Sequence, residues 1–264
     1  LAISSNNSGS SAPSTNYASQ FFANTTSGIM QLRNTANNAH INLFTLAGGP
    51  AFAVDGTINS VNIGKGANSV AGNTVLGESA LDASVSGGNN TAIGKNALTA
   101  LTSGTQNVAV GTNSLDANTS ASFNTGIGFN SLTENTTGTQ NTSVGAYSLD
   151  ANTTGNSNVS IGVNTLGANS TGSQNVAVGR QCLEVNTTAD NNTGVGYQAL
   201  KANTTGAHNT AVGMNALDAN TSASNNTAVG LNALGANTTG AFNVGLGSGA
   251  LDANTTANNN TAVG

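Results

Sequence analysis

The sequence predicts an all-β chain dominated by a parallel β-solenoid, a rod in which successive backbone coils stack as parallel strands. A strict 17-residue repeat and a period-two pattern inside each repeat predict it, as does a shortage of bulky and charged residues. Of 264 residues, 6% are charged and 4% aromatic, whereas about a quarter of an ordinary soluble domain is charged. Disordered chains are usually rich in charge or proline, and this chain has two prolines.

The repeat begins with the pattern Asn-x-x-aliphatic-Gly. Twelve starts follow at intervals of 17 residues without insertion or deletion, at Asn73, Asn90, Asn107, Asn124, Asn141, Asn158, Asn175, Asn192, Asn209, Asn226, Asn243 and Asn260. Counting this asparagine as position 1, glycine occupies position 5 of every copy and leucine position 9 of all eleven complete copies. The resulting structural columns are represented by Asn90, Ile93, Gly94 and Leu98 in one copy, and by Asn209, Val212, Gly213 and Leu217 in another. An unbroken period predicts one structural unit per repeat.

Each repeat predicts one coil made of two strands and two corners. Positions 2 to 4 alternate as a strand, with Thr or Val at position 2 and an aliphatic residue at position 4 sharing one face. Position 3, which points to the other face of the strand, is almost always Ala, Gly or Ser. Such small side chains predict that another part of the chain packs closely against this position. The glycine should end the strand at a corner with positive φ. The Ala-Leu-x-Ala stretch predicts a second short strand, and Asn-Thr-Thr-Gly closes the coil with turn-forming residues.

A single coil has only two large aliphatic side chains, at positions 4 and 9. That is few for a solenoid that must enclose its own interior. We therefore expect chains to associate lengthwise as a homotrimer or another homo-oligomer, which buries the strand face that one coil leaves open.

The first residues differ from the repeat. Residues 1–16 are rich in Ser and Asn and predict a linker or extended arm. Residues 17–56 predict a small β module that caps or joins the rod. Within it, 28–34 and 40–46 alternate apolar and polar residues as two neighbouring strands, and 51–54 predicts a third.

The solenoid should span residues 57–264 in about 12 coils. Its first coil, starting at 61–64, is expected to be shorter than the others, as terminal repeats often are. The array ends mid-coil at Gly264, so we expect the natural chain to continue.

A 34-residue period is superimposed on the 17-residue repeat. Position 10 is acidic in every second coil, at Asp82, Asp116, Asp150, Glu184, Asp218 and Asp252. Acids stacked in every coil would repel by about 0.9 kcal/mol per neighbour even in water, and alternation roughly halves this. Carboxylates two coils apart are too distant to share a calcium ion. A solvated acidic edge is therefore expected, with no metal and no cofactor.

Several function classes are disfavoured. Five basic residues spread along the chain cannot track a phosphate backbone, so no nucleic-acid partner is expected. His40 and His208 lie in unrelated contexts, and the acidic column offers no two carboxyls with distinct environments, so we expect no enzyme. Cys182 replaces a small residue and should be buried and inert. No stretch approaches the ~20 apolar residues that cross a membrane, so no insertion is expected.

Two surface readings of the turn remain open. In nine coils, position 12 is an asparagine followed two residues later by Ser or Thr, the N-glycosylation pattern, represented by Asn118, Asn135, Asn152, Asn203 and Asn237. The competing interpretation, which we favour, is an asparagine ladder at a corner. Stacked columns of Thr also suggest ice binding as a function. Adjacent threonines of an extended chain, however, point to opposite sides, so they give no broad flat face for ice.

The strand-and-corner pattern resembles a known family. Asn90-Thr91-Ala92-Ile93-Gly94 and Asn209-Thr210-Ala211-Val212-Gly213 are similar to the left-handed parallel β-roll repeats of trimeric autotransporter adhesin heads, which also occur in phage tail fibres and other surface fibres. The likeness covers residues 60–264, although this repeat is longer and the stalk and membrane anchor of that family are missing.

The resemblance implies a homotrimer at an extracellular location, on a virion or cell surface or secreted. It also implies attachment to a host-surface glycan or protein. A structural fibre shaft or adhesin is the function we expect. A self-assembling secreted filament and an ice-binding solenoid are the alternatives.

Overall fold

The computed structural model describes residues 20–24, 29–34, 39–45, 56–58 and 60–264. The chain divides into two compact units, Leu1–Gly56 and Thr57–Gly264. Each unit is described by itself below.

The first unit contains a three-stranded antiparallel sheet in the order β1-β2-β3. Strand β2 (Ile29–Asn34) pairs with β3 (Ala39–Thr45), which confirms the expected pair of neighbouring strands. The register shifts between Met30 and Gln31, and β1 (Gln20–Asn24), which the sequence reasoning missed, pairs with the other edge of β2. The expected arm at 1–16 and strand at 51–54 lie outside the described residues.

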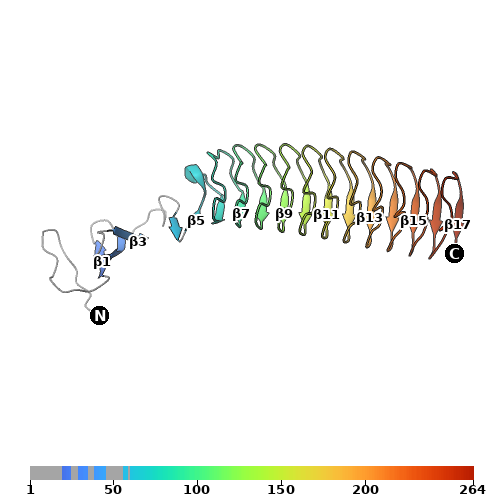
Figure 1. The fold of residues 1–264 in the computed structure, drawn as a ribbon. Helices are drawn as coiled ribbons and strands as arrows, with labels where there is room; N and C mark the ends of the chain where they lie inside the picture. The colour runs from blue at the N-terminus through green and yellow to red at the C-terminus, as the bar shows by residue number, and fades with distance from the viewer. Residues whose placement is uncertain (1–19, 25–28, 35–38, 46–55, 59) are drawn as a thin grey trace. The chain divides into compact units, whose positions relative to one another are not determined.

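The second unit is a parallel β-solenoid with a 17-residue period, as the sequence predicts (Figure 1). Each strand of the repeat except the last pairs in register with the strand 17 residues later, so that Thr142 pairs with Val159 and Val144 with Ile161. The stacked strands are β6 (Thr74–Gly77), β7 (Thr91–Ile93), β8 (Val108–Val110), β9 (Thr125–Ile127), β10 (Thr142–Val144), β11 (Val159–Ile161), β12 (Val176–Val178), β13 (Thr193–Val195), β14 (Thr210–Val212), β15 (Thr227–Val229), β16 (Val244–Leu246) and β17 (Thr261–Val263).

The rod begins with an antiparallel cap, and the expectation of a shortened first coil is wrong. Strand β4 (Gly56–Ile58) neighbours β5 (Val61–Gly64), which pairs antiparallel with β6 and places Asn62 opposite Gly77. A 3₁₀ turn, Ala67–Ser69, then leads into the first coil. The reversed strand occupies the N–H and C=O groups on the first edge of β6, which would otherwise be an open template for pairing.

Each coil has one strand, so the expectation of two strands per coil is also wrong. The segment predicted as the second strand is a turn, in which the position-9 leucine adopts a left-handed conformation, with φ of 53° at Leu98 and 51° at Leu217. Such a conformation costs a non-glycine residue roughly 1–2 kcal/mol. Full burial of a leucine side chain contributes about 1.5–3 kcal/mol, which offsets that cost. The turns still stack, since Leu98 N–H donates to the Ser114 carbonyl at 3.1 Å.

The interior is thin and filled by leucine between small residues. The position-9 leucines from Leu81 to Leu234 are fully buried. Position 3 faces position 8 of a neighbouring coil, so a Cβ added to Gly126 would lie 2.6 Å from the Ser114 Oγ. Likewise, the buried Cys182 thiol lies against Gly194. This confirms that the small position-3 residues meet something close, and that Cys182 is a buried small residue.

Candidate functional site: the outward strand face

The side chains at positions 2 and 4 of β6 to β16 point away from the interior, and we call them the strand face. In each strand from β7 to β16 the middle residue is buried and its two neighbours are half-buried or exposed. The aliphatic position-4 side chains remain open to solvent, with exposed fractions of 40% at Ile161, 36% at Val212 and 37% at Leu246. Ile93 is half-buried in the same column. One chain therefore leaves a continuous aliphatic column uncovered.

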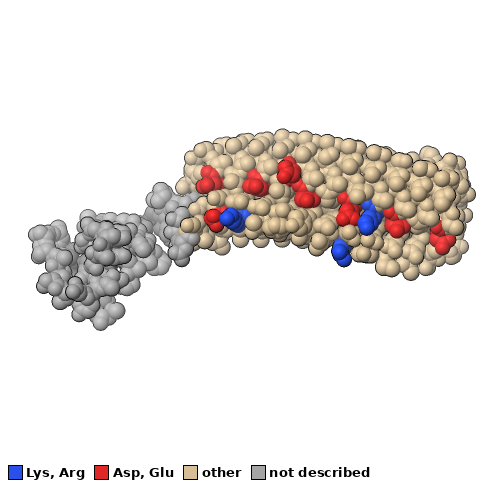
Figure 2. Space-filling model, in the orientation of Figure 1, with Lys and Arg blue, Asp and Glu red and all other residues tan. Residues whose placement is uncertain are grey.

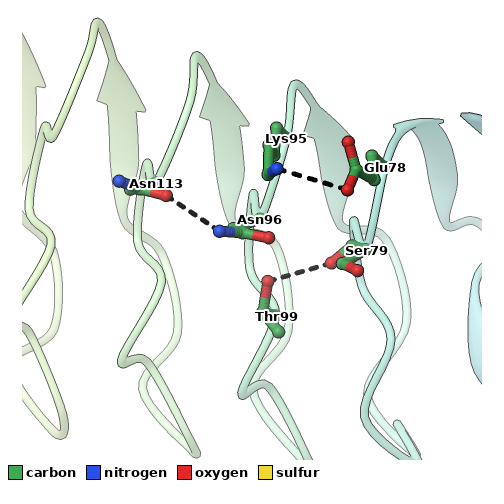
Figure 3. A network of polar contacts seen from close by, with 6 residues as sticks. All are labelled: Glu78, Ser79, Lys95, Asn96, Thr99 and Asn113. Atoms are coloured by element: carbon green, nitrogen blue, oxygen red, sulfur yellow. Dashed lines mark hydrogen bonds and ion pairs between the residues drawn. The ribbon is translucent and has the colours of Figure 1, made fainter.

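A rim at position 6 borders the strand face beyond the glycine corner. In the first coils this rim is charged: Lys95 Nζ lies 3.2 Å from Glu78 Oε1 (Figure 3). From the coil beginning at Asn124 onward the rim is mostly apolar and exposed, at Phe129, Val163, Tyr197, Met214 and Leu231. The Phe129 ring packs edge-on against Tyr147 of the next coil, with centroids 5.3 Å apart. The uncovered apolar surface is thus wider over the later coils.

The position-5 glycines fix the corner between the strand face and this rim. Gly94 and Gly213 have φ of 128° and 137°, which confirms the predicted positive-φ corner. A Cβ at Gly213 would collide with the carbonyl oxygen of Gly230 in the next coil. Only glycine allows coils to stack this closely, so the corner repeats without variation and keeps the strand face regular.

The position-1 asparagines form a buried ladder along the rod. Asn209 is fully buried; its backbone N–H donates to Asn192 Oδ1 at 3.0 Å, and its Nδ2 donates to the Ala223 carbonyl at 2.8 Å. Asn90 makes the equivalent bonds to Asn73 and Gly104. Each amide therefore ties the strand of one coil to the strand before it and to its own closing turn.

A second buried ladder occupies position 12. Asn152 Nδ2 donates to Asn135 Oδ1 at 2.8 Å and to the Gly155 carbonyl at 3.1 Å. The asparagines considered for glycosylation are fully buried, namely Asn118, Asn135, Asn152, Asn203 and Asn237. Their amides are enclosed and hydrogen-bonded, so the folded coil does not offer them to a glycosyltransferase. The burial and the hydrogen bonds of this column favour the ladder interpretation over glycosylation.

The threonines of the closing turn lie differently from the expectation. Thr136 and Thr137 were expected to point to opposite sides, but the turn is not extended and both reach the surface, because the interior is occupied by Asn135 and Gly138. Thr136 Oγ1 donates to the Thr153 carbonyl at 3.1 Å. Positions 13 and 14 therefore form two adjacent surface columns of hydroxyl-bearing residues.

The acidic column lies on an outer face where charged side chains are sparse (Figure 2). Partial burial raises the pKa of Asp150 and of Asp218 above their ordinary value, although backbone hydrogen bonds lower it in part. Lys201 Nζ lies 3.9 Å from Glu184 Oε2 within the same column. Among the described residues, no three His, Cys, Asp or Glu side chains gather as metal ligands.

Comparison with known proteins gives no relative: no family model, no curated protein and no solved structure matches the chain. Within the described residues, no helix has the length and apolar character needed to cross a membrane. The repeat geometry is therefore the basis for any functional assignment.

Proposed function

We propose that this protein is a non-enzymatic extracellular fibre shaft whose chains associate lengthwise, as a homotrimer, through the strand face. The observation that supports the proposal is the aliphatic column at position 4, which is open to solvent along the rod although the leucine column is fully enclosed. Hydrophobic burial favours covering such a column.

The size of the strand face also favours a partner. Three residues at about 3.3 Å and eleven strands at about 4.8 Å give a rectangle of roughly 10 by 55 Å. That is about 550 Å² for the strand face alone, near the upper end of the ~300–600 Å² of the largest apolar patch on a typical monomer. A second and third copy offer the same column at the same spacing, because the coils are in register along the whole rod.

Association of identical rods suits a mechanical role. Three chains around one axis would place the three strand faces inward and leave the Thr and acidic columns on the outside. This outer surface is repetitive and carries few charges, as expected of a shaft that holds another part of a fibre at a distance. Attachment to a host surface and a self-assembling secreted filament are both compatible with such a shaft.

Sedimentation equilibrium of the full chain tests the proposal. We expect a mass three times the 25.7 kDa of one chain. Val212→Asp places a charge on the strand face, and Ser222→Asp is the matched control, because Ser222 lies at exposed position 14 of the same coil. The first substitution should dissociate the assembly without loss of β signal in circular dichroism, and the second should not. A wild-type chain that sediments as a stable monomer would contradict the proposal.

Ice binding is a second candidate, favoured by the paired hydroxyl columns at positions 13 and 14. Thermal hysteresis of the wild-type chain that is lost in Thr171→Val plus Thr188→Val would support it. An absence of thermal hysteresis at any concentration would exclude it.

A further inference from the structure

One pair of consecutive coils, 175–191 and 192–208, shares a departure from the commonest outer residues of the repeat. Position 7 is asparagine in most coils, whereas these two have Gln181 and Gln198. Beside them, position 6 has Arg180 and then Tyr197. In a rod that repeats one surface, a local cluster of departures is the place to look for recognition.

The unusual side chains form one hydrogen-bonded network across both coils. Gln198 Nε2 donates to Gln181 Oε1 at 3.1 Å, and Gln181 Nε2 donates to Glu184 Oε1 at 3.1 Å. The other carboxylate oxygen of Glu184 is paired with Lys201. The two amides are therefore held in place, and the negative charge of Glu184 is balanced.

Both glutamines adopt a left-handed backbone conformation, with φ of 58°. Asparagine tolerates this region because its short side chain can bond locally, and glutamine does so less well. The left-handed conformation recurs at position 7 of other coils, as at Asn113 and Asn215, so it belongs to the repeat. What distinguishes the two glutamines is that they are consecutive in their column and belong to the same network.

Arg180 and Tyr197 place a guanidinium and an aromatic ring at the surface next to this network. Arg180 is exposed, and its guanidinium has no hydrogen bond or ion pair with the described part of the chain. Its carbonyl accepts the Gln198 backbone N–H at 3.1 Å, so the two residues are adjacent. Tyr197 follows Arg180 in the same column, about one coil spacing of 4.8 Å further on, and is 39% exposed.

These groups match one class of ligand. A guanidinium binds a carboxylate through two parallel hydrogen bonds. A tyrosine ring offers an apolar face with a polar tip, which suits the C–H face of a sugar ring. Gln198 Oε1 accepts no hydrogen bond from the described residues and can accept one from a hydroxyl. We propose that Arg180, Tyr197 and Gln198 bind a carboxylate-bearing pyranose, which gives the shaft one attachment point. The inference rests on the proposed fibre function and deepens it by naming a ligand class.

Saturation-transfer NMR and titration calorimetry on the full chain test this site. The probes are 3′-sialyllactose and a glucuronate-containing hyaluronan tetrasaccharide, with lactose as the neutral control. At least one acidic probe should bind and lactose should not. Arg180→Gln should weaken binding about 10- to 100-fold, the effect of losing one bidentate charged contact. Arg180→Lys should weaken it less, and Tyr197→Ala should reduce saturation transfer to the ring protons.

Lys95→Gln is the matched control, because Lys95 occupies the same position 6 and its loss changes the net charge equally. It should bind as the wild type does. The inference is overturned if neither acidic probe binds the folded wild type, if Arg180→Gln binds equally well, or if lactose binds as tightly. Sedimentation of the same samples separates the two proposals: a trimer that binds neither probe contradicts only the ligand site, whereas a monomer contradicts the shaft.

Discussion

Asn175 gives the sharpest test of the buried ladder. Its Oδ1 accepts the Asn192 backbone N–H at 3.0 Å, and its Nδ2 donates to the Ala189 carbonyl at 2.8 Å and to Asn158 Oδ1 at 3.2 Å. Asn175→Asp keeps the shape and the acceptor but replaces the donor with an oxygen that faces two other oxygens. An uncompensated buried charge costs about 3–5 kcal/mol, a large part of the roughly 5–15 kcal/mol stability of a typical domain.

Asn164→Asp is the matched control, because Asn164 lies at the surface and its side chain has no hydrogen-bond partner in the described residues. Its effect should stay within about 0.5 kcal/mol. Guanidinium unfolding followed by circular dichroism measures both variants at pH 7 and pH 4.

The pH dependence adds a second check. Burial raises the pKa of a new carboxyl, so the folded Asn175→Asp chain takes up a proton as pH falls, and the acid form can again donate to the Ala189 carbonyl. The loss of stability should therefore shrink at pH 4. Equal unfolding midpoints for the two variants at pH 7 would refute a buried, hydrogen-bonded ladder.

Four further predictions concern other columns. Gly196→Ala should prevent close stacking, because φ is 139° and the new Cβ collides with the next coil; Gly167→Ala, whose nearest contact is 3.4 Å away, should be tolerated, and equal melting temperatures would contradict this. Leu183→Ala should cost about 2–5 kcal/mol in chemical unfolding, as for a buried leucine, and a loss below 1 kcal/mol would count against its burial. Burial raises the pKa of the Cys182 thiol to about 12, so iodoacetamide at pH 8 should label it only after unfolding; labelling of native protein would oppose this. Burial also raises the pKa of Asp150 above 3.8, so folding takes up a proton in acid and stability should rise as pH falls from neutral. Asp150→Asn should remove that part of the pH profile, and an unchanged profile would argue against it.

The sequence contained the period, the in-register stacking and the glycine corner, because each depends on spacing and on a residue type with one backbone role. It did not indicate the left-handed leucine at position 9. An Ala-Leu-x-Ala stretch has the apolar content of a strand. The turn at this position follows from closing the coil within 17 residues, which the local sequence does not indicate.

Hydropathy alone also misplaces the asparagines. Asn is usually exposed and Val usually buried, yet Asn209 is enclosed and Val212 is 36% exposed. The ladder satisfies every amide along the axis, which removes the usual cost of burying it. The signal was present in the constancy of position 1, which is asparagine in all twelve copies, and of position 12, which is asparagine in nine of the eleven complete coils, while positions 16 and 17 change freely.

The proposed ligand site at Arg180, Tyr197 and Gln198 could not be predicted, for the opposite reason. Its residues are informative only as departures from the repeat, and the repeat pattern describes what the coils share. The hydrogen-bonded network of Gln181, Gln198 and Glu184 depends on side-chain geometry.

Cross-linking tests the lengthwise association of strand faces most directly. In a Cys182→Ala background, Val212→Cys places one thiol on the strand face, and Ser222→Cys places one on the exposed closing turn of the same coil. A short bismaleimide should join Val212→Cys chains into covalent dimers at dilute protein concentration and leave Ser222→Cys chains single. Equal cross-linking of the two variants, or none at Val212→Cys, would contradict the shared strand-face interface.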